Sequence, residues 1–282
     1  MDKFQDICHQ NEQFQCLIYI RINGRDAYLN DDFQFENCMR ILPLEQQARI
    51  LEKRGRTRQI ALVSQLLQLM GCCKATRRNI GDLKFSNGKF GKPRLLGRRV
   101  PAFSMSNSDG FCAMFLRRNS GDEDDENGIP SEVGLDLAST TDCKSWNDEY
   151  LNEFKDIFSV HEFTHLRKTL DAGRGRKLLD RIFTHYWSMK EAYTKFTGTG
   201  LNCDLSEIDL GSVSESDYNR NAEFIRTVQI DQRCMVFRSK WINETVVATV
   251  CYEMGSDDAG SPGLTMCSLE LPEVIIEALN MK

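Results

Sequence analysis

An acidic run interrupts the chain near its middle and constrains the fold more than any other feature. Residues 122–126 are five consecutive acidic residues, flanked by Gly121 and Gly128 in a chain of 282 residues. Such a run cannot be buried in an apolar core and is typical of a solvated linker, although an acidic metal site is an alternative interpretation. We therefore predict two halves, residues 1–120 and 132–282, joined by an acidic linker at 121–131.

Composition limits the class of protein. The chain is 41% hydrophobic and 27% charged, which is typical of a globular protein, and its net charge of −5 argues against non-specific nucleic-acid binding. No apolar run is long enough to cross a bilayer, and residues 1–11 lack the apolar core of a secretory signal. The eleven cysteines include no Cys-x-x-Cys pair, so reduced, buried thiols are expected rather than zinc ligands or disulfides. We expect a cytoplasmic protein without nucleic-acid or membrane partners.

Hydrophobic periodicity predicts an α+β fold in both halves. Each half combines several short strands with one principal helix, and the halves look similar in plan. In the first half the pattern predicts strands at 16–22, 100–106 and 111–116, and helices at 44–53 and from 55 to 71. In the second half it predicts strands at 133–137, 224–230, 234–238 and 246–252, and helices at 176–196 and 271–281.

The predicted helix at 176–196 bears the most informative segment. Trp187, Glu191 and Lys195 follow one another at intervals of four residues, so they lie along one face, opposite the apolar face of the helix. One interpretation is that the carboxylate of Glu191 and the ammonium group of Lys195 form a surface ion pair and have no further role. The aromatic residue one turn earlier favours the wall of a functional site.

A second signal is the aspartate within the apolar strand 133–137. Asp136 either faces solvent at the strand end or is buried, and a buried carboxylate needs a partner or a cation. Gly134 leaves space for the close approach of another backbone or of a ligand. Asp136 and Glu191 together could bind Mg²⁺, which prefers carboxylate and phosphate oxygens, and Lys195 could then reach a phosphate.

These residues resemble a known pair of motifs. Gly134-Leu135-Asp136 followed by Trp187-Ser188-Met189-Lys190-Glu191 and Lys195 is similar to the signatures of the 4′-phosphopantetheinyl transferase superfamily. Gly91-Lys92-Pro93 and Phe103-Ser104-Met105-Ser106 resemble motifs of its larger, surfactin-type branch. Segments 42–51, 64–67 and 195–202 are similar to fungal members that serve lysine biosynthesis.

The resemblance implies a pseudo-dimer of two similar α+β halves, each a small antiparallel sheet on a principal helix, with coenzyme A and Mg²⁺ in the cleft between them. It implies a holo-acyl-carrier-protein synthase that transfers 4′-phosphopantetheine from coenzyme A to a serine of an apo carrier domain and releases 3′,5′-ADP. For the fungal group the carrier is that of aminoadipate reductase, and other carrier proteins could also serve. A monomer is expected.

The resemblance also assigns roles to residues. Asp136 and Glu191 would bind the metal, and with Lys195 they would form the catalytic set. Coenzyme A would contact Lys195 and, in the first half, the following residues: Arg49, Arg58, Lys92 and Ser106. A metal-activated water or Glu191 would deprotonate the carrier serine, and the sequence leaves both open.

Two positions depart from the branch. Ala138 replaces a frequent second acidic residue, and Asn107 replaces a histidine. Two other classes of protein are alternatives. One is an inactive scaffold that retains the fold, but the intact Asp136, Glu191 and Lys195 argue against it. The other is another Mg²⁺-dependent nucleotide phosphotransferase, but the chain lacks a Gly-x-x-x-x-Gly-Lys-Ser/Thr loop.

Overall fold

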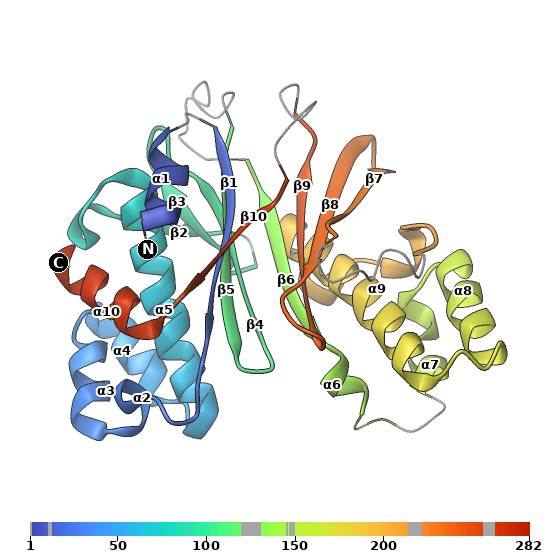
Figure 1. Ribbon diagram of the computed structural model, residues 1–282. Coiled ribbons are helices and arrows are strands. Elements are labelled where there is room, and N and C mark those ends of the chain that lie inside the picture. Colours follow the sequence, from blue (N-terminus) through green and yellow to red (C-terminus); the bar gives the residue numbers. More distant parts are fainter. Residues whose placement is uncertain are drawn as a thin grey trace. The chain divides into compact units, whose positions relative to one another are not determined.

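The computed structural model divides into two compact units, shown in Figure 1. It describes residues 2–10, 13–88, 90–119, 131–144, 146, 150–213, 222–255 and 263–282. Unit 1 comprises Met1–Ser131 and Leu264–Lys282, and unit 2 comprises Glu132–Gly263. The predicted acidic linker lies, except for Ser131, outside the described residues.

The C-terminal segment belongs to unit 1, which corrects the predicted range of 132–282 for the second half. Strand β10 (Thr265–Leu269) pairs in parallel with β1 (Phe14–Arg21) over five residues. Helix α10 (Leu271–Asn280) packs against the principal helix α5 (Gly55–Thr76). The local pattern cannot reveal such a pairing, because its two strands are separated by most of the chain.

Unit 1 is a four-stranded sheet in the order β10-β1-β5-β4, with α5 packed on β5 and β4. The β1–β5 and β5–β4 pairs are antiparallel, as predicted for this half. The prediction of an antiparallel sheet is wrong at β10, which pairs in parallel with β1. The remaining elements are α1 (Asp2–Gln10), α2 (Ala27–Asn30), α3 (Asp32–Met39), α4 (Leu44–Leu51), η1 (Ile80–Asp82), the hairpin β2 (Lys84–Asn87) and β3 (Pro93–Leu96), β4 (Ala102–Ser108) and β5 (Phe111–Arg118).

Unit 2 is a four-stranded, fully antiparallel sheet in the order β6-β9-β8-β7, with α9 packed on β6 and β9. The predicted principal helix and the predicted strands of this unit are all present. Its elements are β6 (Val133–Ser139), α6 (Thr140–Cys143), α7 (Tyr150–Glu153), η3 (Lys155–Ile157), α8 (Val160–Asp171), α9 (Arg176–Thr197), η4 (Gly200–Asn202), η5 (Leu205–Glu207), β7 (Phe224–Ile230), β8 (Arg233–Trp241) and β9 (Val246–Glu253).

The two units share a chain order. In unit 1 the first strand, β1, lies beside β5, and in unit 2 the first strand, β6, lies beside β9. A 22-residue helix follows the first strand in each case, α5 in unit 1 and α9 in unit 2. The molecule is thus an α+β protein, and each unit packs a 22-residue helix on a four-stranded sheet. Over the described residues, no helix is both long and apolar enough to cross a bilayer.

Helix α5 continues past Gly71, where the sequence suggested an end. A Cβ atom at this position would lie 2.6 Å from Sδ of Met114 and 3.3 Å from Cδ1 of Ile18, so this glycine serves the close packing of the helix on the sheet. The helix ends instead at Thr76, because Arg77 adopts the left-handed conformation with a φ of 57°.

Gly134 permits a close contact between helix α9 and strand β6 in unit 2. A Cβ atom there would overlap the carbonyl oxygen of Ala192 and lie 2.7 Å from the backbone nitrogen of Phe196. The clash would involve backbone atoms, which no change of rotamer can relieve. The expectation that Gly134 allows another backbone to approach is confirmed.

We predict that Gly134→Ala destabilises the protein by about 2–3 kcal/mol or more, because overpacking here must separate α9 from β6. Urea unfolding measures the change. Gly24→Ala is the matched control, because its added methyl would meet no atom within 4 Å, and we expect it to change stability by no more than about 0.5 kcal/mol. Equal stability of the two variants would contradict the packing described.

Candidate active site

The contact between α9 and β6 pairs two of the predicted site residues. Nζ of Lys195 lies 2.8 Å from Oδ1 of Asp136. Asp136 is only 6% exposed although it belongs to an apolar strand. The ion pair explains how this carboxylate is tolerated, and it excludes the solvent-facing alternative.

Glu191 lies one helical turn before Lys195 and is half-buried. In the described part of the chain, its carboxylate makes no hydrogen bond or ion pair, so Lys195 pairs with the strand aspartate instead of forming the i, i+4 pair. Burial raises the pKa of Glu191, the negative charge of Asp136 raises it further, and the Lys195 ammonium opposes both effects. Glu191 and Asp136 are therefore close enough for their charges to interact.

This donor set fits a hard divalent cation. Two carboxylates that repel each other in a partly buried place are stabilised by a cation, and oxygen ligands are those that Mg²⁺ prefers. Across the described ranges, no group of three or more His, Cys, Asp or Glu side chains could hold a metal. Among the described residues, Asp136 and Glu191 therefore offer a cation a pair of carboxylates and not a cluster of three.

Ala138 and Trp187 extend the same surface as a packed apolar wall. Ala138 lies two residues after Asp136 on the same side of β6, and it packs with Trp241, Val247 and Trp187. The Trp187 ring also stacks on Phe183 at 6.3 Å between ring centres. Trp187 therefore supports the wall beside the carboxylates.

Lys190, which the sequence analysis left without a role, is fully buried beside Glu191. Its Nζ lies 2.8 Å from Oε2 of Glu162, donates to the carbonyl of Leu205 at 2.7 Å and donates to the carbonyl of Ile208. Burial lowers the pKa of Lys190 and raises that of Glu162, and their mutual attraction opposes both shifts. The pair tolerates burial because hydrogen bonds surround it on both sides.

Glu162 joins this lysine to the start of helix α8. Its Oε2 accepts from the backbone nitrogen of Ser159 at 2.9 Å, and its Oε1 accepts from that of Leu210 at 2.8 Å. Ser159 and Glu162 form a capping box. The Ser-x-x-Glu spacing was the signal available in the sequence. The network fixes α8, α9 and the segment 205–210 to one another.

Unit 1 contains a pocket of about 700 Å³. Its walls come from α4, α5, the β2–β3 hairpin and β4, and its basic side chains are Arg49 and Lys53. Gly91 and Pro93 of the Gly-Lys-Pro motif line it, as does Asn107. Three segments far apart in the sequence thus meet at one pocket, whose lining also includes Glu45, with its Oε1 2.6 Å from Nη2 of Arg49.

The other predicted unit 1 residues lie close to the pocket in sequence but are not among its lining residues. Lys92 stands between Gly91 and Pro93, and Ser106 is a buried residue of β4 next to Asn107. The guanidinium carbon of Arg58 lies 4.4 Å from the ring centre of Phe35. The structure therefore places Arg49 at the pocket and stacks Arg58 on α3.

The pocket also has lining residues that the sequence analysis did not identify. Gln65 and Gln68 belong to α5, whereas Phe85 and Asn87 belong to β2. The Gly-Lys-Pro motif was the available signal, because it lies next to β3 in this hairpin.

Comparison with known proteins identifies the family. A family model described as the 4′-phosphopantetheinyl transferase superfamily matches residues 132–251. The chain is 41% identical to the L-aminoadipate-semialdehyde dehydrogenase-phosphopantetheinyl transferase of Saccharomyces cerevisiae over 235 residues, which cover 83% of this chain and 80% of the relative. The chain belongs to the 4′-phosphopantetheinyl transferase superfamily.

A second relative of this transferase gives the same result. The L-aminoadipate-semialdehyde dehydrogenase-phosphopantetheinyl transferase of Eremothecium gossypii is 35% identical over 229 residues, covering 81% of this chain and 76% of the relative. The range matched by the family model contains Asp136, Glu191 and Lys195. The family resemblance that the motifs around these three residues indicated is therefore confirmed.

We predict that Lys190→Met destabilises the transferase by about 3–5 kcal/mol, because it leaves the Glu162 carboxylate buried without its counter-charge. Urea unfolding of Lys190→Met, Glu162→Gln and the double variant forms a double-mutant cycle. The double variant should lose clearly less than the sum of the single losses.

Arg40→Met is the matched control, because Arg40 forms an exposed ion pair with Glu36 at 2.8 Å. Its cost should stay below about 1 kcal/mol. Additive losses at Glu162 and Lys190 would show that the two side chains do not act as a pair.

Proposed function

We propose that this transferase moves the 4′-phosphopantetheine group of coenzyme A to a serine of the apo carrier domain of aminoadipate reductase, with release of 3′,5′-ADP. The observation that carries the proposal is the juxtaposition of Asp136 and Lys195, with Glu191 one turn away. The relatives in S. cerevisiae and E. gossypii bear names that include L-aminoadipate-semialdehyde dehydrogenase, which supports the choice of carrier.

Asp136 and Glu191 are the residues that would hold Mg²⁺. The ion, when bound, neutralises charge on the pyrophosphate of coenzyme A. Lys195 adds a fixed positive charge beside Asp136, where it can stabilise the negative charge of a phosphate. Glu191, whose pKa is raised, is one candidate for the base that accepts the serine proton, and a metal-activated water is the other.

The unit 1 pocket is the proposed site of the nucleotide end of coenzyme A. Arg49 is suited to the 3′-phosphate because a guanidinium group binds phosphate oxygens in a fork. The side chains of Lys92 and Ser106 would approach from the hairpin and from β4. The size of the pocket, about 700 Å³, is in the range of small-molecule sites.

The finer architecture is also a proposal. We infer a pseudo-dimer in which unit 1 binds coenzyme A and unit 2 supplies the metal ligands. The shared order of strand, 22-residue helix and further strands supports this inference. We further propose a cytoplasmic monomer that serves the carrier of aminoadipate reductase and other carrier proteins.

We predict that Asp136→Ala, Glu191→Ala and Lys195→Ala each reduce transfer about 10³-fold or more while the protein remains folded. Each removes a metal ligand or a phosphate-facing charge. Mass spectrometry of the carrier domain, at saturating coenzyme A and Mg²⁺, measures the transfer, and circular dichroism checks the fold. This assay also separates an active transferase from an inactive scaffold.

The exposed residues Asp171 and Lys168 of α8 provide matched controls. Asp171→Ala and Lys168→Ala remove the same kinds of charge and should leave transfer within about twofold, because exposed charges have small effects. Turnover near that of the unmodified protein in any of the three site variants would refute its assignment.

We predict that Arg49→Ala weakens coenzyme A binding about tenfold or more, and dephospho-coenzyme A binding much less, because only the former has a 3′-phosphate. Calorimetry with both ligands tests this. The same comparison on Arg58→Ala decides the role of Arg58: a selective loss assigns it to the 3′-phosphate, and equal losses assign it to packing on Phe35. Equal losses for Arg49→Ala would place the 3′-phosphate elsewhere.

A further inference from the structure

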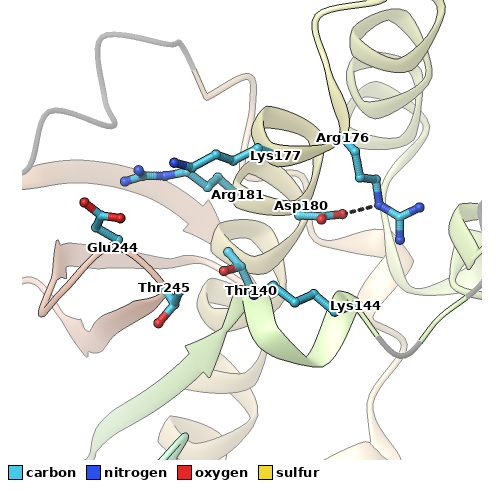
Figure 2. Close-up of a pocket in the computed structure, with 8 residues that line it drawn as sticks. All are labelled: Thr140, Lys144, Arg176, Lys177, Asp180, Arg181, Glu244 and Thr245. Carbon is cyan, nitrogen blue, oxygen red and sulfur yellow. Dashed lines mark hydrogen bonds and ion pairs between the residues drawn. The ribbon is translucent and has the colours of Figure 1, made fainter.

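Unit 2 contains a pocket of about 450 Å³ at the start of α9, shown in Figure 2. Glu191 lies near the other end of this helix. The pocket is formed by α6, the first turns of α9 and the turn between β8 and β9. Four of its lining residues are basic and two are acidic: Lys144, Arg176, Lys177 and Arg181, and Asp180 and Glu244. The pocket therefore has an excess of positive charge that the proposed transfer reaction does not use.

One of the acidic residues is already engaged. Oδ1 of Asp180 lies 2.7 Å from Nε of Arg176 and accepts from the hydroxyl of Tyr150 at 3.1 Å. Arg176 also donates to the carbonyl of Cys143 at 3.1 Å, and its guanidinium carbon lies 4.6 Å from the Tyr150 ring centre. This arginine is held in place without a ligand, so little side-chain entropy would be lost on binding.

A second guanidinium group is held by stacking. The guanidinium carbon of Arg181 lies 4.2 Å from the ring centre of Trp241. Lys177 is one helical turn before Arg181, and Figure 2 shows both side chains extending from α9 in the same direction. Like charges at this spacing repel each other, and an anion between their head groups would relieve the repulsion.

The lysines of the pocket are available to a ligand. Lys144 and Lys177 are exposed, and neither makes a hydrogen bond or ion pair with any residue that the structure describes. The first turn of α9 contains no acidic residue, and its N-cap, Gly175, provides no side-chain cap. The partial positive charge of this helix end is therefore added to that of the side chains.

We propose that this pocket binds a small phosphate-bearing anion. The guanidinium groups of Arg176, paired with Asp180, and of Arg181, stacked on Trp241, suit phosphate oxygens. The two exposed ammonium groups match a charge of −2, and the volume fits a small phosphate ester or free phosphate. Arg181 precedes Glu191 by ten residues, roughly 15 Å along a helix. The pocket is thus a site distinct from the proposed metal ligands and does not depend on the proposed function.

Calorimetric titration of the full chain with inorganic phosphate, pyrophosphate and phenyl phosphate tests the proposal. We expect saturable binding of at least one probe, and the strongest of the three shows whether free phosphate, a diphosphate or a phosphate ester is preferred. Lys177→Ala/Arg181→Gln should weaken it about tenfold or more, because two charged contacts are lost. Binding should persist in Arg49→Ala and in Lys195→Ala, which separates this pocket from the unit 1 pocket and from the proposed active site.

Two further variants distinguish a specific anion-binding site from non-specific electrostatic attraction. Arg167→Gln/Lys168→Ala removes the same charges from the exposed surface of α8 and should leave binding unchanged. Glu244→Gln removes a carboxylate from the pocket and should tighten binding about two- to threefold, a gain that misfolding cannot imitate. No saturable binding at millimolar probe, equal losses in the α8 control, or displacement of phosphate by an acidic peptide at lower concentration would each overturn the proposal.

Discussion

The backbone contact of α9 with β6 at Gly134 is the constraint on which the proposed active site depends. With no side chain on Gly134, the helix lies so close that its backbone at Ala192 and Phe196 fills the place of a Cβ atom. Asp136, two residues later on the same face of the strand, then meets Lys195 at 2.8 Å. Any increase in this spacing would separate the carboxylate of the strand from the charged stripe of the helix.

The same helix is fixed from its other side by a buried ion pair. Lys190 and Glu162, neither of them exposed, join α9 to α8 and to the segment 205–210. Lys190 and Glu191, which are adjacent in one motif, therefore lie in different surroundings. The charge of Lys190 is neutralised by Glu162 inside the protein, whereas the carboxylate of Glu191 makes no hydrogen bond or ion pair in the described part of the chain. This division leaves Glu191 available to a cation while holding its backbone in place.

The local pattern of hydrophobic residues predicted the elements that hold the site, because α9, β6 and the other strands of unit 2 have a regular hydrophobic periodicity and clear ends. It failed where distant segments decide the structure. The pairing of β10 with β1 spans most of the chain, and Gly71 stands inside a helix because of Met114, on another strand. Lys190 was overlooked because its partner, Glu162, lies 28 residues away in sequence. The family resemblance directed attention to Asp136, Glu191 and Lys195, which spacing alone did not distinguish from a surface ion pair.

We propose that Asp136 and Glu191 bind Mg²⁺ together with the pyrophosphate of coenzyme A. With Ala138 packed against Trp241, no second strand carboxylate supports the metal, so the free protein should bind Mg²⁺ weakly. Metal and coenzyme A should strengthen each other's binding, because linkage is reciprocal. Calorimetric titration of Mg²⁺ into the protein, with and without coenzyme A, measures this directly. We expect coenzyme A to raise the Mg²⁺ affinity clearly, and we expect this gain to be lost in Asp136→Asn. Tight binding that coenzyme A does not change, or a gain that persists in Asp136→Asn, would contradict it.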